Sequence, residues 1–94
     1  MKIDKVRELL RELSKTHVIE ILQAIDRGHR TPSKLKEELN LNEGTLYPAL
    51  RTLLNLGLIE KKRFKDFPPK VDYVLTPRGQ QILKLIEVIL SMED

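Results

Sequence analysis

The sequence contains no cysteine and no tryptophan, and aromatic residues make up only 4% of its 94 positions. The absence of cysteine excludes disulfides and thiolate metal ligands. No apolar run approaches the roughly 20 residues that a helix needs to cross a bilayer. The segment MKIDKVRELLRELSK interleaves charges with apolar residues, which is not the pattern of a signal peptide. We therefore expect a cytoplasmic protein without disulfides.

Residues that could build a catalytic or metal site are scarce. His17 and His29 are the only histidines, and they do not form a His-x-x-x-His pair. There is no glycine-rich phosphate loop, and each of the four glycines falls where a helix stop, a turn or a restart needs one. No arrangement of Ser, His and Asp indicates a nucleophile. We expect no metal, no cofactor and no enzymatic activity.

The positive charge of the chain is concentrated in one segment. The formal net charge is +3. Residues 61–70, with the sequence KKRFKDFPPK, hold five basic residues and one acidic residue, so the rest of the chain is close to neutral. A neutral body with one basic projection fits a phosphate-contacting element better than a generally basic surface.

Apolar residues at helical spacing predict two helices in the first third of the chain. Residues 3–14 place Ile3, Val6, Leu10 and Leu13 on one seam. Residues 17–27 repeat the pattern and end at Gly28, a helix-stop residue. One long helix over 3–27 is an alternative, but Ser14 and Thr16 are favoured N-cap types, so we expect a break there.

Two further helices follow, separated by a tight turn. Thr31-Pro32 is a strong helix-start signal, and that helix ends near Asn40. Asn42 can cap the next helix, which runs to Leu56 and stops at Gly57. Because a proline inside a helix loses a hydrogen bond, this helix either begins later, near Gly44 or Thr45, or bends at Pro48.

The remainder predicts a hairpin and a last helix. Residues 58–64 and 71–75 have the composition of strands, joined by a loop with Asp66, Pro68 and Pro69. Thr76-Pro77 repeats the helix-start signal for a helix ending near Met92. The fold class is α+β and mainly α, in a single domain over 1–94. An N-terminal helix (1–15) and a C-terminal helix (77–94) flank a core (16–76) that contains the hairpin.

A short helix, a tight turn and a second helix are typical of helix-turn-helix proteins, whose second helix enters the major groove of DNA. Advancing about 100° per residue puts Leu46, Ala49, Leu50, Leu53 and Leu54 on the core side. The opposite side carries residue types that read base edges, and the hairpin can contact phosphates. The predicted DNA-binding residues are Lys34, Thr45, Tyr47, Pro48, Arg51, Thr52, Asn55, Lys61, Lys62, Arg63, Lys65 and Lys70. Phe64 and Phe67 are expected to pack at the base of the hairpin rather than to intercalate, and Tyr47 to pack at the helix edge.

At this point the chain resembles known families. GTLYPALRTLLNLGLIE followed by YVLTPRGQQIL is similar to PadR-like regulators, and FKDFPPKVDYVLTPRG is similar to the hairpin of HxlR-like regulators. The resemblance covers roughly residues 17–90. It implies a winged helix-turn-helix fold and a dimeric, cytoplasmic transcription factor, with the recognition helix in 45–55 and the wing in 61–70. The chain lacks the long C-terminal dimerisation region of many PadR-like proteins and the N-terminal Cys of HxlR-like proteins.

Apolar residues at both ends of the chain predict a homodimer. Residues 82–92 hold eight apolar residues, more than packing on one domain requires. Ile82, Leu85, Ile86 and Ile89 suffice for the core stripe, which leaves Leu83, Val88 and Leu90 for an interface with Ile3, Val6, Leu10 and Leu13. Such a dimer predicts a palindromic DNA site. The alternatives are a winged-helix protein-interaction module and an architectural protein that coats DNA without sequence preference. A small-molecule effector stays open.

Overall fold

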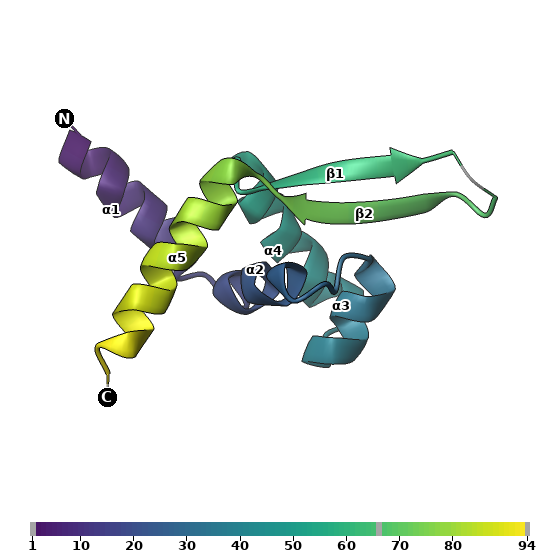
Figure 1. The fold of residues 1–94 in the computed structure, drawn as a ribbon, viewed down its shortest axis with the longest axis horizontal. Helices are drawn as coiled ribbons and strands as arrows, with labels where there is room; N and C mark the ends of the chain where they lie inside the picture. The colour runs from purple at the N-terminus through teal and green to yellow at the C-terminus, as the bar shows by residue number, and fades with distance from the viewer. Residues whose placement is uncertain (1, 66, 94) are drawn as a thin grey trace.

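The computed structural model describes residues 2–65 and 67–93 of the chain (Figure 1). In chain order the elements are α1 (Lys2–Leu13), α2 (Val18–Asp26), α3 (Pro32–Leu39), α4 (Glu43–Asn55), β1 (Ile59–Phe64), β2 (Lys70–Leu75) and α5 (Pro77–Ser91). The mainly helical α+β architecture predicted from the sequence is confirmed. Asp66, in the predicted loop between the strands, lies outside the described residues. Within those ranges no helix is both long and apolar enough to span a membrane.

The break between α1 and α2 is confirmed, but neither predicted capping residue makes the cap. The hydroxyl of Ser14 donates back to the carbonyl of Arg11 at 2.8 Å and so closes the end of α1. His17 occupies the N-cap position of α2, with a φ of 65° and no capping hydrogen bond from its side chain. The chain therefore changes direction through a left-handed residue.

The caps of α3 and α4 are confirmed. The hydroxyl of Thr31 accepts from the backbone N–H of Lys34 at 3.2 Å. The side chain of Asn42 accepts from the N–H of Thr45 at 3.0 Å, which satisfies a donor that the helix itself leaves free. α4 begins at Glu43 and continues through Pro48, so the alternative of a later start is wrong.

α2 lies at the centre of the fold, between α4, α3 and the hairpin (Figure 1). It buries Val18, Ile21, Leu22, Ala24 and Ile25. α4 buries Leu46, Ala49, Leu50 and Leu53 against it, as its periodicity predicts, and Leu54 is partly buried. Burying a Leu or Ile side chain stabilises the folded state by about 1.5–3 kcal/mol, so this apolar contact holds α4 in place while its opposite face remains free.

β1 and β2 form an antiparallel hairpin that projects from the helices (Figure 1). The register pairs Ile59 with Leu75 and Phe64 with Lys70. Ile59 is the only buried residue of β1, and Tyr73 is the only one of β2. The backbone N–H of Tyr73 donates to the carbonyl of Arg30 at 2.7 Å. The base of the hairpin is thus attached to the body, whereas its outer half is held by its own ladder.

The start of α5 is locked against the end of α4. The hydroxyl of Thr76 accepts from the N–H of Gly79 at 3.0 Å and donates to the carbonyl of Gly57 at 2.6 Å. The N–H of Thr76 donates to the carbonyl of Leu58 at 3.1 Å. A Cβ at Gly79 would lie 2.0 Å from that same carbonyl oxygen. Glycine is therefore required at this point of close backbone approach.

The face of α5 that packs on the body differs from the predicted one. Leu83 is only 4% exposed and Leu13 only 7%, so the prediction that these two residues belong to a dimer interface is wrong. Leu85 and Ile89, assigned to the core stripe, are 60% and 57% exposed. The contact at Gly79 turns α5 so that Leu83, four residues later on the same side of the helix, enters the core.

We predict that Gly79→Ala lowers the free energy of unfolding by about 1–3 kcal/mol or more, because the new methyl group must displace a backbone carbonyl. Gly44→Ala is the matched control, since its Cβ would meet nothing closer than 3.4 Å. In α4 that change should be neutral or stabilise by up to about 1 kcal/mol. Urea unfolding followed by circular dichroism measures both, and equal stabilities would refute the close contact.

Candidate nucleic-acid interface

The outward face of α4 carries three exposed side chains, Pro48, Arg51 and Asn55, with Tyr47 39% exposed beside them. Thr45 and Thr52, also predicted to face outward, are half-buried. At about 100° per residue they lie on the flank of the helix, between its buried and its exposed face. The face that a binding partner can reach directly is therefore narrower than the sequence predicted.

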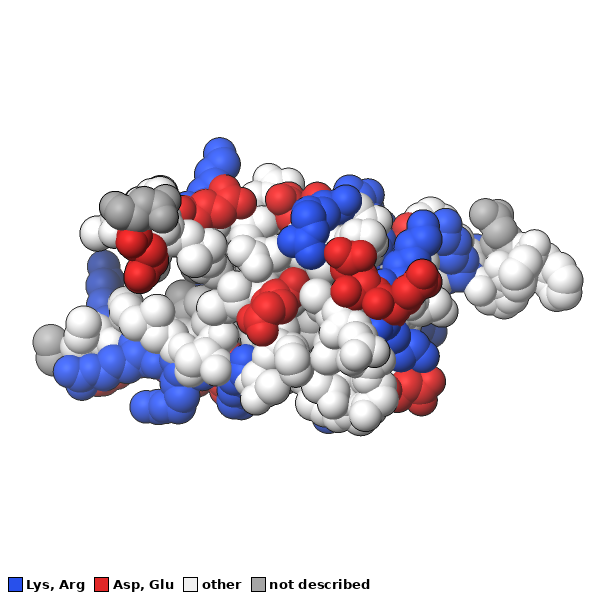
Figure 2. Space-filling view, turned by 90° about the horizontal axis from the view of Figure 1, so that it is seen from below, with Lys and Arg blue, Asp and Glu red and all other residues white. Residues whose placement is uncertain are grey.

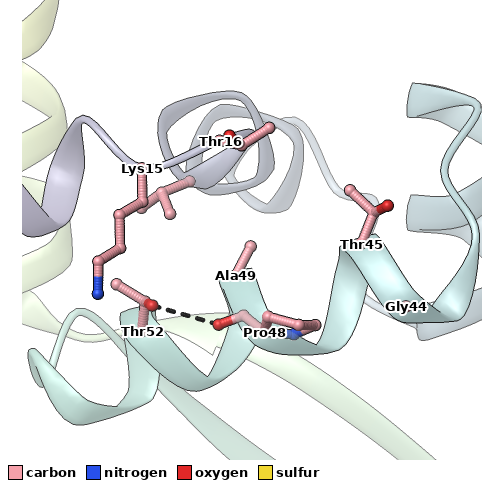
Figure 3. Close-up of a pocket in the computed structure, with 8 residues that line it drawn as sticks. Lys15, Thr16, Gly44, Thr45, Pro48, Ala49 and Thr52 are labelled. Atoms are coloured by element: carbon pink, nitrogen blue, oxygen red, sulfur yellow. Dashed lines mark hydrogen bonds between the residues drawn. The ribbon is translucent and has the colours of Figure 1, made fainter.

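Thr45 and Thr52 border a pocket of about 340 Å³ between α4 and the junction of α1 with α2 (Figure 3). Lys15 and Thr16 form its opposite wall. The hydroxyl of Thr52 donates to the carbonyl of Pro48 at 3.2 Å (Figure 3). The sequence did not indicate that Lys15 and Thr16 lie beside α4. The only indication in the sequence was that Lys15, a basic residue, falls in the predicted break between the first two helices.

Asn55 lies at the end of α4 beside two carboxylates. It borders a second pocket of about 290 Å³ together with Glu8, Glu12 and Lys15. Lys15 forms an ion pair with Glu12 there. The negative charges of Glu8 and Glu12 disfavour an approaching phosphate, so Asn55 is less well placed for nucleic acid than Pro48 or Arg51.

Lys34 lies apart from the outward face of α4. It borders a pocket at the turn between α2 and α3, with Arg27, His29, Glu37 and Glu38. The contact between α3 and the start of α4 is made instead by Lys36, whose ammonium group is 3.2 Å from Glu43. The structure therefore does not group Lys34 with the other predicted site residues of the helix-turn-helix.

The basic residues of the hairpin are all exposed: Lys61, Lys62, Arg63, Lys65 and Lys70. Residues directly opposite in an antiparallel pair share a face of the ribbon. Lys61 opposes Tyr73 and Arg63 opposes Val71 on one face, whereas Lys62 and Lys70 lie on the other. Figure 2 shows Lys and Arg gathered along the hairpin. Asp72 opposes Lys62, and Glu60 lies on the same face two residues before it. The net positive charge of the two strands therefore lies on the face of Lys61 and Arg63.

The two phenylalanines do not pack as expected. Phe64 is 41% exposed and Phe67 is 98% exposed. The expectation that both pack at the base of the hairpin is wrong for Phe67, because the tip lies beyond the reach of any helix. Phe64, at the last pair of the ladder, is only partly covered.

Tyr47 and Tyr73 lie where α4 meets the hairpin. Burial raises the pKa of the Tyr73 phenol above its ordinary value, the Tyr47 phenol raises it further, and Arg63 opposes the shift. Tyr73 is 3% exposed, so its ring fills the joint between β2 and the body. Tyr47 and Arg63 are thus close to this joint, which sets the direction of the hairpin relative to α4.

α1 and α5 lie at the end of the molecule opposite the hairpin (Figure 1) and expose apolar side chains there. On α1, Ile3, Val6 and Leu10 are about half exposed. The exposed apolar residues of α5 are Leu85, Val88, Ile89, Leu90 and Met92. Within a single chain these apolar side chains are largely uncovered. On α5, all of the exposed apolar residues except Leu90 repeat at i, i+3, i+4 and i+7 spacing and therefore form one stripe along the helix.

Each histidine lies beside a different carboxylate. His17 Nδ1 lies 3.7 Å from Glu20, and His29 Nε2 lies 3.6 Å from Glu38. Among the residues that the structure describes, no three His, Asp or Glu side chains gather as metal ligands would.

Comparison with known proteins places this arrangement in a family. The winged helix-turn-helix family matches residues 14–94. An uncharacterised HTH-type transcriptional regulator of Methanocaldococcus jannaschii is 32% identical over 87 residues, covering 90% of this chain and 81% of the relative.

Two crystal structures share the fold. A MarR-family regulator from Enterococcus faecalis superposes with a TM-score of 0.89 at 20% identity, over 99% of this chain and 86% of that chain. A PadR-like transcription factor from Bacteroides fragilis gives 0.74 at 24% identity, over 94% and 90%. The relatives are transcriptional regulators and not enzymes, and the hairpin corresponds to the wing. The chain belongs to the winged helix-turn-helix family of transcriptional regulators.

Proposed function

We propose that this protein binds duplex DNA as a homodimer, with α4 in the major groove and the wing on the neighbouring backbone. We expect it to work in the cytoplasm. The observation that carries the proposal is the free outward face of α4 next to a basic hairpin. Pro48 and Arg51 are exposed on that face, and all five basic residues of the wing are accessible.

The N-terminal half of a recognition helix makes the base contacts in helix-turn-helix proteins. This favours Thr45, Tyr47 and Pro48 near the start of α4, and Arg51 one turn later, as the residues that face bases. Arg51 suits a bidentate pair with guanine. Thr16, across the pocket from Thr45, is well placed to contact the phosphate backbone beside that groove, whereas the ammonium group of Lys15 is already paired with Glu12. Asn55, next to Glu8 and Glu12, contributes least, and Lys34 contacts only the periphery.

The apolar end supports the homodimer. A stripe of Leu85, Val88, Ile89 and Met92 on α5, together with Ile3, Val6 and Leu10 on α1, can cover its own copy across a two-fold axis, the commonest oligomer symmetry. This interface lies opposite the wing, so pairing leaves both α4 helices accessible. Two recognition helices about 34 Å apart would then read a palindromic site.

The first test replaces the wing lysines. Lys61→Ala, Lys62→Ala and Lys65→Ala together should weaken binding to every duplex and reduce the log–log salt slope by about 0.9 for each phosphate that the wing no longer neutralises. Titration of a labelled random duplex across a salt series measures the slope. The control removes the same charge at the apolar end, with Lys2→Ala, Lys5→Ala and Lys84→Ala, and should leave the slope nearly unchanged.

The outcome of this titration also separates the alternatives. A protein-interaction module would bind no duplex, and an architectural protein would bind selected and random duplexes equally. An unchanged slope in the wing variant would exclude the wing from the interface.

The second test addresses base reading by Arg51. On a duplex selected from a random library, Arg51→Ala should cost about 1–3 kcal/mol of binding free energy, with a smaller loss on random duplex. Arg51→Lys keeps the charge but not the bidentate geometry, so it should also lose discrimination. Equal losses on both duplexes would assign Arg51 to the backbone instead.

The third test concerns assembly. Leu85→Glu with Ile89→Glu should convert the dimer into a folded monomer, because both side chains lie outside the core and charges there oppose pairing. Lys84→Glu, on the same helix but outside the apolar stripe, should remain dimeric. Sedimentation equilibrium at micromolar concentration gives the mass of each protein. A monomeric unmodified protein would contradict the proposal.

A further inference from the structure

The most exposed large apolar side chain of the described residues is Phe67, at the tip of the wing. It is 98% exposed, and an isolated, fully exposed aromatic ring at the end of a projecting hairpin contributes nothing to the core. Among described apolar residues with large side chains, the next most exposed is Met92, at 76%, near the end of α5. The apolar stripes on α1 and α5 are covered in the proposed dimer, whereas Phe67 lies at the opposite end of the molecule and packs on no described part of the core.

The surroundings of Phe67 point to an anionic partner. Lys61 and Arg63 lie on one face of the ribbon and Lys62 and Lys70 on the other, and all four are exposed. Glu60 and Asp72 share the second face and offset its two lysines, so the face of Lys61 and Arg63 is the one that attracts phosphate. The minor groove of duplex DNA offers a phosphate strand beside a narrow space for the tip, since the groove is about 6 Å wide.

The length of the wing fits this position. A strand of six residues, such as β1, spans about 20 Å. Neighbouring major and minor grooves are separated by about half of a 34 Å helical turn, or roughly 17 Å. With α4 in a major groove, the tip therefore reaches the next minor groove.

We propose that Phe67 inserts between two base pairs from the minor groove and unstacks them. This inference rests on the proposed DNA binding and adds a residue that acts through deformation of the duplex. Apolar wedges of this kind kink DNA toward the major groove and favour steps that unstack easily, such as TA and CA. Phe67 would thereby add sequence preference at a step that no hydrogen bond reads.

Two proline residues support the wedge. Pro68 and Pro69 follow Phe67 directly, and each restricts φ and has no N–H to desolvate. The backbone behind the ring can therefore enter a groove without leaving a donor unpaired. Aromatic stacking on a base is worth enough that its removal weakens binding about 5- to 150-fold.

The experiment uses the full-length chain and a duplex selected from a random library, with the fluorescent base 2-aminopurine placed in turn at each step flanking the α4 half-site. Unstacking brightens this base. The unmodified protein should brighten one flanking position, and Phe67→Ala should abolish that signal and weaken binding at least about fivefold, without changing the salt slope. Phe67→Trp should restore both. Phe64→Ala, on the same hairpin, should retain the signal.

Since Phe67 makes no core contact, the melting temperature of Phe67→Ala should equal that of the unmodified protein, so a loss of binding cannot reflect misfolding. Undiminished affinity and an unchanged signal in Phe67→Ala would overturn the wedge while leaving DNA binding intact. An unmodified protein that binds no duplex would overturn the proposed function and the wedge together.

Discussion

The arrangement of α4 and the hairpin depends on one junction, where the turn after α4 meets the start of α5. Thr76 bridges the carbonyl of Gly57 and the N–H of Gly79, and its own N–H closes onto Leu58. These few bonds determine where the recognition helix ends, where the hairpin ladder begins and how α5 is rotated. Gly79 allows the approach because any side chain would collide with the Leu58 carbonyl.

Local signals in the sequence were sufficient to predict most of the secondary structure. Thr31, Asn42 and Thr76 each cap the helix they were expected to cap, because an N-cap depends on a side chain and a backbone N–H three residues away. The buried face of α4 followed from periodicity in the same way. His17 is the exception, since its left-handed conformation depends on how α1 and α2 pack and not on its own preference.

Features set by tertiary contacts could not be predicted from the sequence. Apolar residues surround most of α5, so its periodicity is compatible with more than one buried face, and only the contact at Gly79 selects Leu83 over Leu85. Thr45 and Thr52 are half-buried because the junction of α1 with α2 lies beside them. Phe67 resembles a core residue in the sequence, but the hairpin carries it beyond the body. The resemblance to winged-helix proteins predicts the order of helices and strands, but it does not predict which side chains of α4, α5 and the hairpin are buried.

The sparse attachment of the wing has a consequence for conformational entropy. Beyond Val71, which packs partly against the core, the described residues of the hairpin are held mainly by the pairing of the two strands, and an isolated two-stranded hairpin is marginally stable in water. A partner that fixes the orientation of this hairpin must offset the conformational entropy that the hairpin loses. Pro68 and Pro69 limit that loss, because they remove backbone freedom before any partner arrives. The wing thus combines strands that have few contacts with the body and two prolines that lower the entropic cost of ordering it.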